Sequence, residues 1–117
     1  MSLKLNVKKV GDVAVVYCNG RIVFGDEASD LREKVKSLIA ESSKIVLNLG
    51  GVSYIDSGGL GTLVGLYTSA RSSSGDIRLA NLTQRVRDQL AITKLVTVFE
   101  SFESEDAAVA SFAKAAS

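Results

Sequence analysis

The stretch that decides the fold is YIDSGGLG, residues 54–61. Immediately before it, residues 44–49 (KIVLNL) form a short apolar run with β-branched side chains, which is typical of a buried parallel strand. After it, apolar side chains recur at the spacing of one helix face, at Leu60, Leu63, Val64 and Tyr67. The sequence therefore predicts a glycine-rich turn from a strand into a helix, with Ser57 at or beside the helix N-terminus. In open α/β sheets, ligands gather at this edge.

Strands and helices alternate along the rest of the chain. Alternating apolar residues predict an edge strand at residues 3–8 and, after a glycine turn, an antiparallel second strand at residues 12–19. Residues 20–25 are expected to form a loop bounded by glycines. The patterns then predict helices at residues 27–41, 83–92 and 105–115 and short strands at residues 76–80 and 96–99, with Asp26 and Ser104 as helix N-caps. The order ββαβαβαβα predicts an α/β fold in one domain, residues 1–117, with a mixed, mostly parallel sheet of four to five strands and about four helices.

Composition narrows the class of protein. The 117 residues suffice for one domain that buries about two-thirds of the surface of its unfolded chain. A net charge of +1 gives no electrostatic indication of direct nucleic-acid binding. No apolar stretch approaches the roughly 20 residues that span a bilayer, and the first residues lack a signal-peptide core. We therefore expect a cytoplasmic protein without membrane insertion.

The chain has no histidine and a single cysteine, Cys18. Without imidazole there is no Ser-His-Asp triad, no histidine-assisted cysteine nucleophile and no histidine metal ligand. A structural zinc site is also disfavoured, because zinc is held by several cysteines and histidines. Cys18 lies within the apolar run at residues 13–18 and is expected to be a buried structural thiol. We expect no metal, no cofactor and no enzymatic activity.

The residues of the turn at 54–61 disfavour two chemical interpretations, a phosphate-binding glycine loop and a nucleophile elbow. Gly59 and Gly61 begin like a dinucleotide-binding fingerprint, but Val64 stands where the third glycine belongs. The Gly-Lys-Ser/Thr of a phosphate-binding P-loop is also absent. A nucleophile elbow needs a glycine where Ile55 stands and a histidine to activate Ser57.

A third interpretation treats Ser57 as a residue that another protein modifies. Its hydroxyl is flanked by glycines and so is open to a second protein's active site. Phosphorylation would add about −1.5 to −2 charge, which a helix N-terminus can accommodate. Because Asp56 is adjacent, the modified turn would be strongly negative and would expel a docked partner. The alternative is that Asp56 or Ser57 only caps the helix, and both can hold at once.

These residues carry a family resemblance over nearly the whole chain. The sequence resembles a STAS domain of the anti-sigma-factor-antagonist type. The match comprises the opening strand pair, Gly20, residues 45–49 and 54–61, Asn81–Leu82, Val86, Leu90, Thr93 and Val98–Phe99. Ser57 matches the family's phosphorylated serine and Asp56 the carboxylate before it. The chain departs from the family at Gly58, where a second Ser or Thr is usual, and at Arg21 and its neighbours, where an acidic residue is usual.

The resemblance implies a switch protein that is not an enzyme. Its unphosphorylated form would bind an anti-sigma factor of the serine-kinase type and thereby free a sigma factor; the kinase would phosphorylate Ser57, and a serine phosphatase would restore the complex. The docking residues implied by the resemblance and by their types are Asp56, Ser57, Gly58, Gly59, Leu60, Arg21, Phe24 and Tyr54. Phe24 and Tyr54 are expected to be half-buried. The alternatives are a constitutive STAS subunit of a transport or stressosome-like complex, without a phosphorylation cycle, and a small-ligand or nucleotide-binding enzyme.

Overall fold

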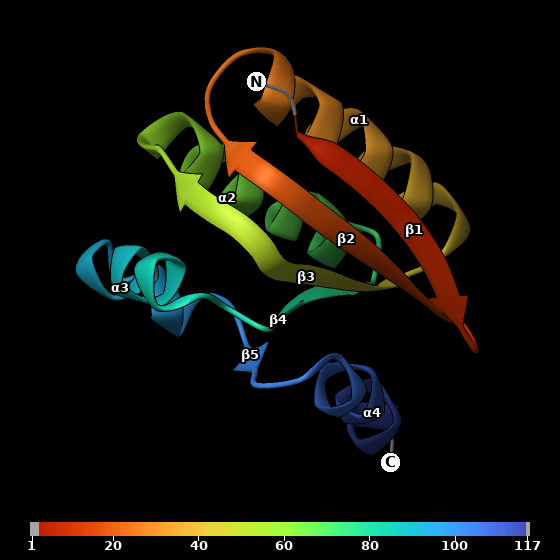
Figure 1. Cartoon of the computed structure of the whole chain (residues 1–117). Coiled ribbons are helices and arrows are strands. Elements are labelled where there is room, and N and C mark those ends of the chain that lie inside the picture. Colours follow the sequence, from red (N-terminus) through yellow and green to blue (C-terminus); the bar gives the residue numbers. More distant parts are fainter. Residues whose placement is uncertain (1–2, 117) are drawn as a thin grey trace.

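The computed structural model describes residues 3–116 as a five-stranded sheet with helices on both faces. The helices α1 and α2 lie on one side of the sheet and α4 on the other (Figure 1). The elements follow in the order β1 (Lys4–Val10), β2 (Val13–Ile22), α1 (Asp26–Glu41), β3 (Lys44–Ile55), α2 (Ser57–Ser72), β4 (Asp76–Ala80), α3 (Gln84–Ile92), the short 3₁₀ helix η1 (Leu95–Thr97), β5 (Ser101–Phe102) and α4 (Glu105–Ala116).

The sheet is mixed and mostly parallel, which confirms the predicted fold class. The strand order is β1-β2-β3-β4-β5, with β1 antiparallel to β2 and every later pair parallel. Because β2 and β3 run in the same direction, their carboxyl ends meet at one edge of the sheet. The segments that leave this edge lead into α1 and α2, and the predicted site lies on the second of them.

Two strands are longer than predicted. β2 continues through Gly20 to Ile22, so the first half of the predicted loop at residues 20–25 is strand. β3 continues through Gly50–Gly51 to Ile55, because the β2–β3 pairing is irregular there and accommodates the glycines. Pairing with β2 therefore extends to Ile55, the residue before Asp56.

The predicted strand at residues 96–99 is wrong. The segment forms η1, and the fifth strand is the two-residue β5 further along the chain. Of the apolar residues in segment 96–99, Phe99 is buried and packs edge-to-face against Tyr67, with ring centroids 5.2 Å apart, whereas Val96 is 50% exposed. Asp26 is also not an N-cap, since α1 begins with it and Gly25 precedes it at φ +113°, a conformation suited to glycine. Ser104 does cap α4, accepting the Ala107 N–H at 3.0 Å.

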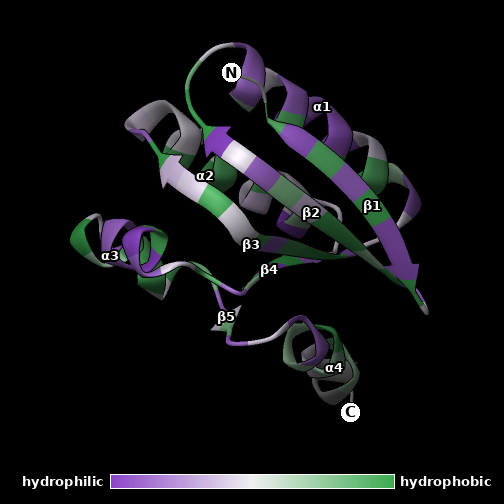
Figure 2. Ribbon diagram, in the orientation of Figure 1, coloured by the Kyte–Doolittle hydropathy of each residue, from purple (hydrophilic) through white to green (hydrophobic). Residues whose placement is uncertain are grey.

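Two apolar clusters hold the layers together. The larger lies between the sheet and the helices α1 and α2, and the smaller lies under α4. Figure 2 shows hydrophobic residues alternating with hydrophilic ones along β1. Of the residues predicted to face inward from α2, Leu60 and Leu63 are buried, whereas Val64 and Tyr67 are half-buried at the core's rim. Cys18 is 1% exposed and packs in the larger cluster, as predicted, and burial raises the pKa of its thiol to about 12.

Candidate functional site

The turn between β3 and α2 places Ser57 at the first position of the helix, as predicted. Asp56 is the N-cap residue, and its carboxylate accepts the Gly59 N–H at 2.7 Å. This bond satisfies one of the four backbone N–H groups that an α-helix leaves without an internal partner. Ser57 itself is exposed. The capping role therefore belongs to Asp56, and the Ser57 side chain is not needed for it.

Asp56 also holds the segment that enters α1. Both of its carboxylate oxygens accept the backbone N–H of Phe24, each at 3.1 Å. Its own N–H donates to the Ile22 carbonyl at 3.2 Å, which continues the β2–β3 pairing by one bond. Asp56 thus joins two segments that lie 32 residues apart in the sequence.

The two glycines after Ser57 are needed for close contacts between these segments. A β-carbon at Gly59 would lie 2.0 Å from the Ile22 carbonyl oxygen, so α2 can start against the end of β2 only with glycine there. A β-carbon at Gly58 would lie 2.6 Å from the β-carbon of Phe24. Gly58 therefore allows Phe24 to sit directly on the first turn of α2, which gives a physical reason for this departure from the family pattern.

The sequence predicted a half-buried Phe24, but in the structure this residue is 80% exposed. The Asp56 carboxylate and the contact with Gly58 hold its backbone, while its ring faces solvent beside Ser57. A large apolar side chain that is this exposed, on a backbone held by hydrogen bonds to Asp56, has the character of a protein-interface anchor. Leu60, by contrast, is buried, so it can offer only part of its surface to a partner.

Arg21 and Tyr54 form a separate pair on the opposite face of the same sheet edge. They are register partners in the β2–β3 ladder, one position before Ile22 and Ile55, which point into the core. Because side chains alternate along a strand, Arg21 and Tyr54 point away from α1 and α2. Tyr54 is half-buried, as predicted, with the Arg85 guanidinium 5.3 Å from its ring centroid. The structure therefore brings Tyr54 together with Asp56, Ser57 and Leu60 around one hollow and places Phe24 against Gly58, whereas Arg21 lies outside this group.

The sequence interpretation missed Ile92, the last residue of α3. It is 80% exposed and lines a shallow hollow of about 240 Å³ beside Ser57, together with Tyr54, Leu60, Gln89 and Thr93. The Gln89 side chain fixes α3 there by bonding both the N–H and the carbonyl of Ile55. The sequence contained a signal for Ile92, because Val86 and Leu90 mark the buried face of α3 and Ile92 does not lie on that face. Ser57 thus shares a hollow with the exposed Ile92, and the exposed Phe24 lies against the next residue, Gly58.

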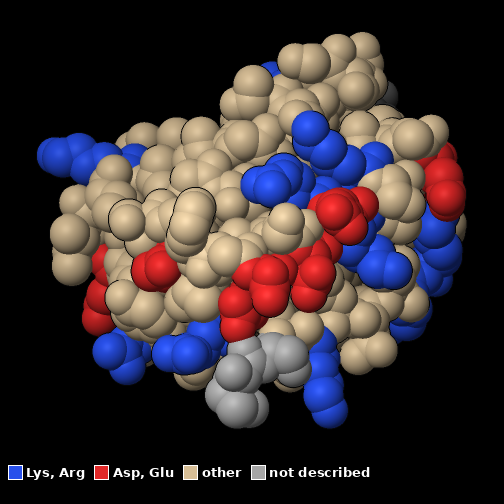
Figure 3. Space-filling view, turned by 90° about the horizontal axis from the view of Figure 1, so that it is seen from above, with Lys and Arg blue, Asp and Glu red and all other residues tan. Residues whose placement is uncertain are grey.

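Among residues 3–116 there is no group of three carboxylate or cysteine side chains that could hold a metal ion. The face seen from above carries Lys and Arg side chains beside Asp and Glu side chains rather than charge of one sign (Figure 3). No helix in the described part of the chain has the length and apolar character to cross a membrane.

Comparison with known proteins agrees with this fold. The family model of the STAS domain matches residues 4–108. The anti-sigma-B factor antagonist of Bacillus subtilis is 32% identical over 86% of this chain and 91% of its own length. The proposed anti-sigma factor antagonist TM1081 of Thermotoga maritima has a crystal structure that superposes with a TM-score of 0.84, at 26% identity and 92% coverage of both chains. The phosphorylated form of SpoIIAA, a Bacillus cell-fate determinant, shares the fold with a TM-score of 0.68 at 20% identity, covering 89% of this chain and 96% of that one.

The chain therefore belongs to the STAS domain family, and its relatives in sequence include anti-sigma factor antagonists.

Proposed function

We propose that this protein is an anti-sigma factor antagonist that works as a phosphorylation-controlled binding switch. The unphosphorylated form binds a serine-kinase anti-sigma factor in the cytoplasm, and this binding releases a sigma factor. The kinase phosphorylates Ser57 with ATP and so ends the complex, and a serine phosphatase regenerates the binding form. The protein itself performs no catalysis in this cycle.

The observation that carries the proposal is the position of Ser57. It is exposed, it begins α2, and the neighbouring Asp56 supplies the helix cap in its place. A kinase can therefore modify the Ser57 hydroxyl without removing a hydrogen bond that holds the fold. The relatives named above support the function, since one is an anti-sigma-B factor antagonist and another was solved in a phosphorylated form.

The chemistry of the turn explains how a phosphate would end binding. Phosphoserine carries about −1.5 to −2 charge, and the start of α2 can tolerate that charge because backbone N–H groups and the helix dipole face it. A bound partner would meet this dianion beside the Asp56 carboxylate, near the exposed apolar side chains of Ile92 in the same hollow and of Phe24 against Gly58. Desolvating two adjacent like charges against apolar contacts is strongly unfavourable. Phosphorylation is thus expected to weaken docking and to leave the fold intact.

The departure at Gly58 is compatible with this switch. Phe24 occupies the space that a side chain at position 58 would need, so the glycine is explained by packing rather than by loss of the phosphoacceptor. Ser57 remains adjacent to the capping Asp56.

The test is an incubation of the protein with the serine-kinase anti-sigma factor of its own genome and ATP, followed by mass spectrometry. We expect one phosphate, on Ser57, which is absent in Ser57→Ala. Ser53→Ala is the matched control, because Ser53 is an exposed serine four residues earlier and its loss should leave the phosphate count unchanged. A protein that binds the kinase but stays unmodified at Ser57 would contradict the switch and favour a constitutive subunit.

A further inference from the structure

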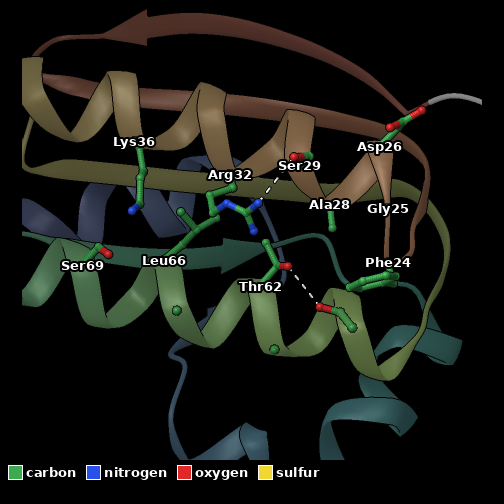
Figure 4. A pocket seen from close by; sticks show the side chains of 13 residues that line it. Phe24, Gly25, Asp26, Ala28, Ser29, Arg32, Lys36, Thr62, Leu66 and Ser69 are labelled. Atoms are coloured by element: carbon green, nitrogen blue, oxygen red, sulfur yellow. Dashed lines mark hydrogen bonds between the residues drawn. The ribbon is translucent and has the colours of Figure 1, made fainter.

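A groove lies between α1 and α2, and it begins at the proposed docking site. It has a volume of about 710 Å³ and runs from Phe24 and Gly58 at one end to Lys36 and Ser69 at the other (Figure 4). From Gly58 to Ser69, α2 rises about 17 Å, or three turns. The groove is therefore long enough to hold a short helix alongside α1 and α2.

Two glycines of α2, Gly61 and Gly65, line this groove, and no contact within the part of the chain that the structure describes requires a glycine at either position. A β-carbon at Gly61 or Gly65 would have no other atom within 4 Å, so packing does not exclude a side chain at either position. Glycine inside a helix is less stable than alanine, because it loses more backbone entropy on folding. Gly59, in contrast, is required by its contact with Ile22. These two glycines destabilise α2, and no contact among the described residues offsets that cost. We therefore infer that they let another protein approach the α2 backbone closely.

The α1 wall of the groove is basic. Arg32 and Lys36 lie one helical turn apart and point toward α2 (Figure 4). The Arg32 guanidinium is held only by a long hydrogen bond of 3.4 Å to the Ser29 hydroxyl. Among the side chains that the structure describes, no carboxylate forms an ion pair with Arg32 or Lys36. The one carboxylate on the lining is Asp26, at the end next to Phe24.

We propose that the groove receives a helix of the protein that docks at Ser57. That helix packs its backbone against Gly61 and Gly65 and presents acidic side chains to Arg32 and Lys36. Acidic residues four apart on the incoming helix would match the spacing of Arg32 and Lys36. The assignment rests on the proposed function, because the groove is continuous with the Ser57 site through Phe24 and Gly58 and extends its interface.

Alanine substitution of the two glycines tests the proposal, because it should make the protein more stable and its binding to the partner weaker. Gly61→Ala with Gly65→Ala should raise the urea midpoint of the isolated protein, because two helix positions gain a better helix former without a clash. The same variant should bind the serine-kinase anti-sigma factor at least about tenfold more weakly in calorimetric titration, since two methyl groups stand between the helices. Because this variant should be more stable than the unsubstituted protein, unfolding cannot explain its weaker binding.

Charge reversal tests the basic wall independently. Arg32→Glu and Lys36→Glu should each weaken binding to the kinase by about tenfold or more, and the loss should shrink at high salt. Lys34→Glu is the matched control: it makes the same charge change on α1, but Lys34 lies on the far side of the helix, beside Leu3 and Leu5. Its affinity should stay within about twofold of the unsubstituted protein.

The outcomes separate this inference from the proposed function. If the kinase binds and phosphorylates Ser57 while the alanine and charge variants bind normally, the groove assignment is wrong and the switch stands. If those variants instead abolish self-association of this chain, the occupant is a second copy and the assignment is again wrong. If the kinase neither binds nor modifies the unsubstituted protein, the switch fails and the groove assignment falls with it.

Discussion

Phe24 fills the space that a side chain at Gly58 would need: a β-carbon on Gly58 would lie 2.6 Å from the β-carbon of Phe24 and 3.2 Å from its α-carbon. The family's usual serine is therefore incompatible with this conformation. We predict that Gly58→Ser lowers the free energy of unfolding by about 1–3 kcal/mol, the usual range for overpacking, as measured by urea denaturation.

The control for this prediction removes the obstruction from the other side. Phe24→Gly deletes the clashing β-carbon and should recover much of the loss caused by Gly58→Ser, so that the double-mutant cycle gives a coupling energy of about 1 kcal/mol or more. Phe24→Ala keeps the β-carbon and should not recover it. Additive effects of Phe24→Gly and Gly58→Ser would show that the two residues do not compete for space.

Asp56 should stabilise the fold through three backbone contacts. Asp56→Ala removes the cap on Gly59 and both bonds to the Phe24 N–H, and we predict a loss of about 2 kcal/mol in unfolding free energy. Asp26→Ala is the matched control, because Asp26 is also at a helix start but makes no capping bond. Its loss should stay below about 1 kcal/mol. Equal losses at the two positions would contradict the role assigned to Asp56.

The sequence predicted the start of α2 better than it predicted the strands around it. The start of α2 could be found because capping residues, glycines and helical spacing are local signals. The extent of β3 could not, since its passage through Gly50–Gly51 depends on an irregular pairing with β2 that local patterns do not reveal. The segment at residues 96–99 has the local pattern of a short strand, because a buried aromatic residue such as Phe99 cannot be told from an apolar strand residue by periodicity alone.

The exposure of Phe24 depends on a contact that is distant in the sequence. An apolar residue in a glycine-bounded segment usually packs inward, but the Asp56 carboxylate, 32 residues away, holds the Phe24 backbone so that its ring faces out. Likewise, the register of β2 and β3 points Arg21 away from α1 and α2, and Arg21 does not join the hollow in which Tyr54 lies with Ser57. Such long-range geometry is set by the assembled sheet.

Cys18 should be inert in the folded protein. It is 1% exposed, and burial raises the pKa of its thiol from the ordinary 9.0 to about 12, so reactive thiolate is about a thousandfold scarcer. We predict that iodoacetamide labels the native protein at least about a hundredfold more slowly than the protein in urea. As the chain has one cysteine, all labelling reports on Cys18. Equal rates would contradict its burial.

Glu105 attaches the start of α4 to the sheet and should give stability a dependence on pH. Its carboxylate accepts hydrogen bonds from the Tyr17 hydroxyl and from Lys8, at 3.1 Å, and Asn48, at 3.4 Å. The Tyr17 bond above all, and then Lys8 and Asn48, hold the pKa of Glu105 below its ordinary value of 4.5. Because the pKa is lowered by folding, the stabilisation is complete above that ordinary value and is lost as pH falls through the lowered one.

Glu105→Gln should therefore be less stable than the unsubstituted protein by about 1 kcal/mol at pH 7, and the difference should disappear in strongly acidic solution. Urea denaturation across this pH range measures it. Glu103→Gln changes an exposed carboxylate two residues earlier and should stay within about 0.5 kcal/mol at every pH. A Glu105→Gln difference that persists unchanged at low pH would exclude the charge of Glu105 as its cause.

The central claim is that a phosphate on Ser57 sets the affinity for the anti-sigma factor. The direct measurement is calorimetric titration of that factor with the unphosphorylated protein and with protein phosphorylated only on Ser57. We predict binding at least about a hundredfold weaker for the phosphorylated form, which corresponds to roughly 3 kcal/mol, with unchanged circular dichroism. Equal affinities of the two forms would contradict the switch.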